Sequence, residues 1–177
     1  MAAQETILLE CGKNEQALEI IEEHRLVLEQ LADWRELAAC LGNEAVAHMQ
    51  LGNLHKALDI HGHEESLCRL VGDLDGLQAS LGNQATLKMK LNYCSEALEL
   101  LTEQEKICHQ IGKITSLANC YSNQAFIHAQ RGELARAAEL LKQQEMLARK
   151  MGSEKQLLIA LSAQKALGLV GLDRDFD

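Results

Sequence analysis

The stretch LGNEAVAHMQLGNLHKAL at residues 41–58 recurs forty residues later as LGNQATLKMKLNYCSEAL at residues 81–98. The same period relates small residues and asparagines over most of the chain, namely Ala17, Ala57, Ala97 and Ala137; Gly72, Gly112 and Gly152; and Asn43, Asn83 and Asn123. A fixed period at several independent positions indicates a repeat protein. We therefore divide the chain into a single array of three complete repeats, residues 36–75, 76–115 and 116–155, with a partial repeat at 1–35 and a half repeat with a tail at 156–177.

Each repeat has the pattern of a helical hairpin. Apolar residues recur at helical spacing on both sides of a break, which falls at Gly12, Gly52, Asn92 or Gly132. The period of these residues predicts nine helices, at residues 4–11, 14–31, 35–50, 54–71, 75–90, 94–111, 115–130, 134–151 and 155–169. The predicted fold class is therefore all-α.

The composition agrees with a helical protein and excludes several classes of function. The 177 residues are 47% hydrophobic and 3% aromatic, contain no proline and carry a net charge of -9. Negative charge and few aromatic residues disfavour binding to nucleic acid. No segment is long and apolar enough to span a membrane, and the first residues lack the basic region of a signal peptide. We expect a cytoplasmic protein whose six cysteines are reduced.

The repeats resemble the tetratricopeptide repeat (TPR) in its forty-residue form, as in kinesin light chains and Pins/LGN proteins. The matching residues are a small residue in the first helix (Ala45, Ala85, Ala125), a turn glycine (Gly52, Gly132) and the alanine that opens each second helix. The family's closing proline is missing, and Asn92 replaces one turn glycine. The resemblance implies a right-handed superhelical solenoid that acts as a non-enzymatic protein-interaction scaffold, with a concave groove formed mainly by the first helices.

Other recurring residues have structural interpretations. Glu65, Glu105 and Glu145 each precede a basic residue by four positions (Arg69, His109, Arg149), which is typical of solvated helix pairs. Cys40 shares its repeat position with Ser80 and Cys120, so the position favours a small buried side chain over a nucleophile. In HGHEE at residues 61–65, the two histidines point to different sides of a helix and cannot share an ion. We expect no catalytic residue, metal or cofactor.

By the same resemblance, the groove is lined by Asn43, Val46, Gln50, Asn83, Thr86, Lys90, Asn119, Asn123, Phe126 and Gln130. The three asparagines at the full period can donate to and accept from the backbone of a bound peptide, or they can bridge adjacent repeats. Small residues beside them, Gly42, Gly82 and Ser122, keep the groove floor low. The basic residues that clamp a carboxylate in chaperone-binding members of the family are missing from the matching positions.

The predicted partner is therefore a peptide segment or helix of another protein. One alternative is a self-assembling module that forms homo-oligomers through its ends, at Leu8 and Leu9 on one side and Leu158, Leu161 and Leu167 on the other. A second alternative is the sensory part of a larger regulator. Charge also differs along the chain: residues 1–75 carry 5 basic and 15 acidic side chains, and residues 76–177 carry 12 and 11.

Overall fold

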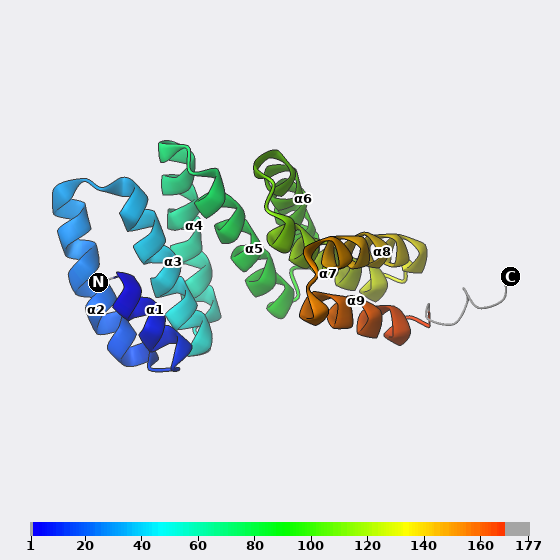
Figure 1. Ribbon diagram of the computed structural model, residues 1–177. Helices are drawn as coiled ribbons and strands as arrows, with labels where there is room; N and C mark the ends of the chain where they lie inside the picture. The colour runs from blue at the N-terminus through cyan, green and yellow to red at the C-terminus, as the bar shows by residue number, and fades with distance from the viewer. Residues whose placement is uncertain (1, 169–177) are drawn as a thin grey trace, which may run out of the picture. The chain divides into compact units, whose positions relative to one another are not determined.

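The computed structural model describes residues 2–168, all of whose regular secondary structure is α-helical (Figure 1). The helices are α1 Ala2–Glu10, α2 Asn14–Leu31, α3 Trp34–Gln50, α4 Leu54–Val71, α5 Leu74–Lys90, α6 Cys94–Ile111, α7 Ile114–Gln130, α8 Leu134–Met151 and α9 Glu154–Ala166. The nine predicted helices and the all-α class are thus confirmed. Residue 169, the predicted end of the last helix, and the rest of the predicted tail lie outside the described residues.

Helix ends follow from local sequence at repeat-equivalent positions, by which we mean positions forty residues apart. The side chains of Asp33, Asp73 and Ser153 each accept a hydrogen bond from a backbone N–H in the first turn of the helix that follows. At the hairpin turn, Asn92 has a φ of 64° and so adopts the left-handed conformation that glycine provides elsewhere. The replacement of the turn glycine by asparagine therefore leaves the hairpin intact.

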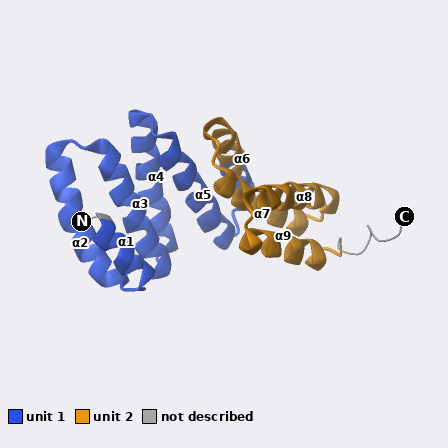
Figure 2. Ribbon diagram, in the orientation of Figure 1, with its two compact units in different colours: residues 1–100 blue, residues 101–177 orange. Residues whose placement is uncertain are grey.

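The chain forms two compact units, Met1–Leu100 and Leu101–Asp177 (Figure 2). In the first unit, consecutive helices from α1 to α5 pack in pairs. The first helices of successive hairpins also touch, α1 with α3 and α3 with α5, whereas α2 and α4 make no comparable contact among the described residues. In the second unit, α8 packs against both α7 and α9.

Small residues recur at buried positions of the helices. The alanine that opens each second helix is fully buried in all four copies, Ala17, Ala57, Ala97 and Ala137. The alanines predicted to lie in the first helices, Ala45, Ala85 and Ala125, are also buried. Cys40, Ser80 and Cys120 are buried as well, and at the equivalent place in α9 stands a buried alanine, Ala160. The predicted packing role of these small residues is confirmed.

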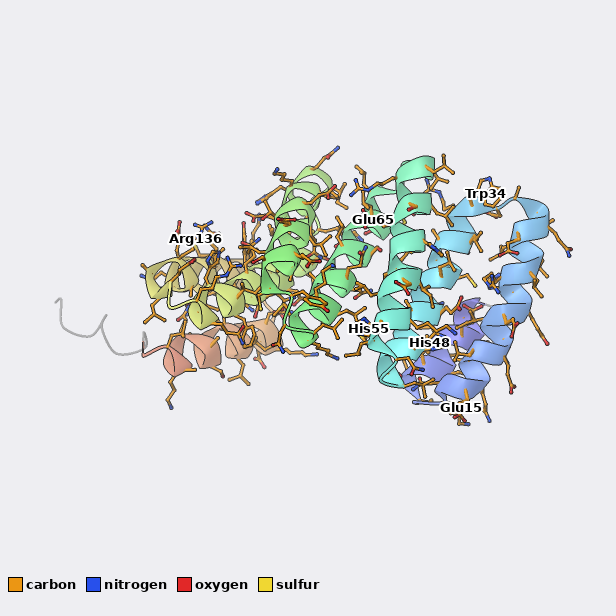
Figure 3. All side chains as sticks on the ribbon, turned by 180° about the vertical axis from the view of Figure 1, so that it is seen from behind. Glu15, Trp34, His48, His55, Glu65 and Arg136 are labelled. Atoms are coloured by element: carbon orange, nitrogen blue, oxygen red, sulfur yellow. The ribbon has the colours of Figure 1, made fainter. Side chains whose placement is uncertain are left out.

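A polar bridge, not predicted from the sequence, joins each later hairpin to the helix that follows. Gln84 on α5 donates to Glu65 on α4 over 2.7 Å (Figure 3 labels Glu65), and its equivalents Gln124 and Gln164 donate to Glu105 and Glu145 over 2.8 and 2.9 Å. Each glutamine Nε2 also lies within 3.5 Å of a carbonyl oxygen on the same neighbouring helix. These glutamates therefore connect helices and are more than solvated surface groups.

The predicted glutamate–base pairs are present in two of the three copies. Arg69 bonds to Glu65 over 2.9 Å, and Arg149 bonds to Glu145 over 2.7 Å. In the third copy the expected partner differs, since His109 Nε2 lies 3.1 Å from Tyr121 Oη. The hydroxyl comes from α7, so His109 also links two helices.

Candidate functional site

Asn43 belongs to the internal bonding of the first unit. Its Nδ2 donates to Glu5 Oε2 over 2.8 Å, which ties α3 to α1. The neighbouring Gly42 is small for an internal reason too, because a Cβ there would lie 2.7 Å from Glu64 Oε1. At this position, the bridging alternative for the asparagines is the one that the structure shows.

Asn83 on α5 and Asn123 on α7 are used differently from Asn43. Both are half-buried, and neither side chain has a hydrogen-bond partner among residues 2–168. Their amide atoms are also not among the buried polar atoms without a partner, so they remain open to solvent. Each asparagine therefore has free donor and acceptor groups for an added molecule.

The other predicted groove residues differ in their burial and in the internal contacts that they make. Val46 packs against the core of the first unit, and the Thr86 hydroxyl donates to the Gly82 carbonyl over 2.9 Å. Asn119 Oδ1 accepts a hydrogen bond from Gln156 Nε2 over 2.9 Å, which joins α7 to α9. Three residues are exposed at the carboxyl ends of their helices: Gln50, Lys90 and Gln130.

An apolar pocket lies in the second unit, where residues of α7, α8 and α9 surround it. It has a volume of about 190 Å³ and is lined by Ser122, Ala125, Phe126, Ala129, Leu141, Ala163, Ala166 and Leu167. Phe126, a predicted groove residue, is 52% exposed although it is large and apolar. Because small alanines line both sides, the pocket can accept an apolar side chain next to the aromatic ring.

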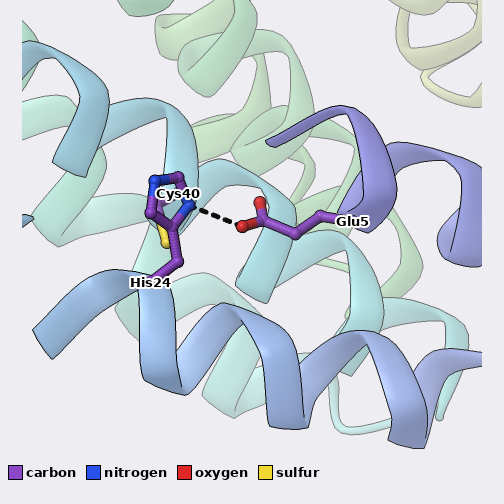
Figure 4. A group of neighbouring side chains, drawn as sticks. All are labelled: Glu5, His24 and Cys40. Atoms are coloured by element: carbon purple, nitrogen blue, oxygen red, sulfur yellow. Dashed lines mark hydrogen bonds and ion pairs between the residues drawn. The ribbon is translucent and has the colours of Figure 1, made fainter. Parts of the chain in front are cut away.

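A second group of polar side chains, not predicted from the sequence, lies in the first unit. Glu5 on α1, His24 on α2 and Cys40 on α3 converge, with their ligand-type atoms within 4.8 Å of one another (Figure 4). His24 Nδ1 lies 2.6 Å from Glu5 Oε1, and the Glu5 side chain is fully buried. Cys40 Sγ points to the Ile21 carbonyl oxygen at 3.6 Å.

The buried thiols are poor nucleophiles at neutral pH. Burial raises the pKa of Cys40 and of Cys120 to about 12, and that of Cys68 to about 11. At Cys40 the negative charges of Glu5 and Glu44 add to this effect. The three thiols are therefore protonated in the absence of a bound cation.

The HGHEE stretch places one of its histidines in the interior and the other at the surface. His61 is fully buried, and its Nδ1 lies 2.6 Å from Glu64 Oε2, whereas His63 is exposed. The two histidines thus lie on different sides of α4. The group contains a buried acid–base pair and does not bring both rings to one point.

Comparison with known proteins identifies the fold. No protein-family model matches the sequence, and no curated protein matches it. Among solved structures, the chain is similar over 95% of its length to a putative kinesin light chain with nearly identical TPR-like repeats from Podosopora anserina, with 19% identity, a TM-score of 0.73 and 88% of that chain covered. The chain has a TPR-type helical repeat fold.

Two further TPR-type structures extend the comparison. Aspartyl phosphate phosphatase F from Bacillus subtilis matches with a TM-score of 0.90 and 13% identity over 95% of this chain. BtubC (BKLC) from P. vanneervenii matches with a TM-score of 0.66 and 12% identity, and 83% of that chain is covered. The chain spans only 44% of the length of the phosphatase, so the likeness concerns the repeat fold. None of the helices in residues 2–168 combines the length and hydropathy that crossing a membrane requires.

Proposed function

We propose that this TPR-type chain is a non-enzymatic, cytoplasmic scaffold that binds a peptide segment or helix of another protein along its first helices. TPR-type repeats are protein-interaction modules, and α5 and α7 carry Asn83 and Asn123, whose side chains have no hydrogen-bond partner among residues 2–168. The proposed contact residues are those predicted from the sequence, except that Asn43, Val46, Thr86 and Asn119 are engaged within the fold. The observation that carries the proposal is the apolar pocket beside Phe126.

The size of the pocket favours a side chain over a small-molecule ligand. Small-molecule sites usually have volumes of roughly 300–1,000 Å³, whereas this pocket has about 190 Å³. Its wall is made mainly of alanine, leucine and phenylalanine side chains. One apolar side chain of a partner peptide is therefore the expected occupant.

Asn123 supplies the second element of recognition, because it follows Ser122 directly and precedes Phe126 by less than one helical turn, and both of these residues line the pocket. Its free amide can bond to the peptide backbone while an apolar side chain fills the pocket. In the first unit, Asn83 and the exposed Lys90 offer an amide and a cation on α5. We infer that these groups contact the backbone and an acidic residue of a partner.

A random peptide library selected against the wild-type chain tests the proposal. Peptides with an apolar anchor should be recovered, and Ala166→Phe should weaken their binding by at least about tenfold, because the new ring fills the pocket from α9. The matched control is Ala135→Phe, an exposed alanine on α8 that does not line the pocket. Fluorescence anisotropy of the labelled peptide gives the affinities. Recovery of no peptide, or equal affinity in both variants, contradicts the proposal.

Self-association is a second candidate function, and an exposed apolar side chain on α9 favours it. Leu158 is 67% exposed, and the neighbouring Ile159 is also exposed. At the other end, Leu9 is buried and Leu8 packs against the core, so the N-terminal leucines are less available. Light scattering distinguishes the candidates: a concentration-dependent oligomer that Leu158→Glu returns to monomer supports self-association, and a wild-type monomer excludes it.

A further inference from the structure

We propose that Glu5, His24 and Cys40 form a zinc-binding site that joins the first three helices. The three side chains come from α1, α2 and α3 and supply one oxygen, one nitrogen and one sulfur atom (Figure 4). Carboxylate, imidazole and thiolate are the ligands that zinc takes in proteins. This site is separate from the proposed peptide-binding face.

The spacing of the three groups requires only small adjustments. Ligand atoms around a tetrahedral zinc ion with bonds of about 2.0–2.3 Å lie roughly 3.3–3.7 Å apart. The three groups already lie within 4.8 Å of one another, and His24 and Glu5 are in direct contact at 2.6 Å. Rotation of the side chains can therefore place an ion between them without moving the helices.

A divalent cation would balance the charge of the site. Binding removes the thiol proton of Cys40, so the ion faces one thiolate, one carboxylate and a neutral imidazole, and the sum is zero. A buried group without net charge avoids the desolvation penalty of an isolated ion. Asn43 donates to the other oxygen of Glu5 over 2.8 Å and so orients the carboxylate from outside the site.

The repeats show that this donor set is particular to the first three helices. Glu5 stands where the later repeats have the buried alanines Ala45, Ala85 and Ala125. His24 stands where they have Glu64, Gln104 and Gln144, which are also buried. Only the thiol recurs at its position, as Cys120, and no other group of three metal-ligating side chains is found in residues 2–168.

The same repeats provide replacements that the fold tolerates. The repeat position of Cys40 is occupied by a serine, Ser80, in the next repeat. The Ser80 hydroxyl donates to the His61 carbonyl over 2.9 Å, and the Cys40 thiol points in the same way to the carbonyl of Ile21. Glutamine occupies the His24 position as Gln104 and Gln144. Cys40→Ser and His24→Gln should therefore fold, which circular dichroism checks. Cys120→Ser is the matched control, because Cys120 is equally buried but has no histidine beside it.

The test is titration of the tag-free, metal-stripped full chain with Zn²⁺ and, separately, Co²⁺, in a buffer with a non-chelating phosphine reductant. Calorimetry should show one zinc ion per wild-type chain, and cobalt should give a thiolate charge-transfer absorption in the near ultraviolet. Cys120→Ser should behave like wild type. Cys40→Ser and His24→Gln should each bind zinc about 100-fold more weakly or worse, and Cys40→Ser should lose the thiolate absorption.

Zinc should also raise the melting temperature of wild type and of Cys120→Ser but not of the two site variants, since the ion binds only the folded site. Absence of stoichiometric zinc binding by the wild-type chain overturns the proposal. Equal zinc affinity in wild type, Cys40→Ser and His24→Gln also overturns it, because binding then takes place at surface histidines.

Discussion

The junction of α2 with α3 and that of α8 with α9 occupy equivalent repeat positions but have different polar chemistry. At the later junction, Gln164 donates to Glu145 over 2.9 Å in a direct bridge. At the earlier one, the same two positions hold Glu44 and Arg25, and Arg25 Nε lies 3.9 Å from Glu44 Oε2. The repeat therefore determines which side chains meet, and the individual residues determine what the contact does.

The interior of the hairpins shows the same contrast. At one position of the second helices, α8 carries the buried Gln144 and α2 carries the half-buried His24. Only His24 meets a buried carboxylate, that of Glu5. Departures from the repeat thus mark the places where this chain has properties that repeats alone do not give.

The largest expected effect concerns a feature that both regions share. Enlarging the fully buried alanine near the start of the second helix should overpack the core, so Ala17→Leu on α2 and Ala137→Leu on α8 should each lower the free energy of unfolding by about 1–3 kcal/mol. Urea denaturation measures the change, with the exposed Ala135→Leu as the control. A wild-type midpoint for either variant would show that the repeats do not share this packing.

A smaller effect is expected at the end of α2, where the first hairpin departs from the repeat. Ala32 has a φ of 54°, in the left-handed region, whereas α4 and α8 end at Gly72 and Gly152. Because a Cβ disfavours this conformation, Ala32→Gly should raise the free energy of unfolding by about 0.5–1 kcal/mol. Thermal melts measure this change, and the control is Ala135→Gly, which should be destabilising. A loss of stability in Ala32→Gly would contradict the prediction.

The smallest effect concerns the bridge at α8 and α9 in acid. The hydrogen bond from Gln164, together with those from Arg149, lowers the pKa of Glu145 below its ordinary value of 4.5. A lowered pKa in the folded state stabilises the protein above pH 4.5, and this contribution disappears as the pH falls through the folded-state value. Gln164→Leu should therefore make the free energy of unfolding fall less steeply with acid, by a few tenths of a kcal/mol.

The control for that measurement is Gln30→Leu, which changes an exposed glutamine on α2. Denaturant midpoints between pH 3 and pH 6 give both slopes. Parallel slopes for Gln164→Leu and wild type would show that the bridge does not influence the ionisation of Glu145.

The helices and the buried alanines could be predicted from the sequence because they depend on local periodicity and on side-chain size. The bridges were missed although their signal is present: Glu65, Glu105 and Glu145 each precede Gln84, Gln124 and Gln164 by nineteen residues. Helical spacing within one helix predicts Arg69 as the partner of Glu65 but does not predict Gln84 on the next helix. Partners on the next helix appear only when two recurring positions are compared across the whole period.

The candidate sites were less predictable than the fold. Asn43, Asn83 and Asn123 share a repeat position, but Asn43 alone meets a carboxylate, because Glu5 replaces an alanine on the neighbouring helix. Glu5, His24 and Cys40 lie on three helices and have no common period, so spacing could not bring them together. For the asparagines and for this group, the signal in the sequence is a residue that differs from its equivalents in the other repeats.

The most direct test of the account compares Asn43→Ala with Asn123→Ala for stability and for affinity to a library-selected peptide. Asn123→Ala should leave the melting temperature nearly unchanged and weaken peptide binding by about 1–2 kcal/mol, since a hydrogen-bonding group of the bound peptide loses its partner. Asn43→Ala should keep the affinity and lower the free energy of unfolding by about 1–3 kcal/mol, because buried Glu5 loses a donor. Full affinity with lost stability in Asn123→Ala would contradict the account, because this asparagine would then be an internal bridge like Asn43.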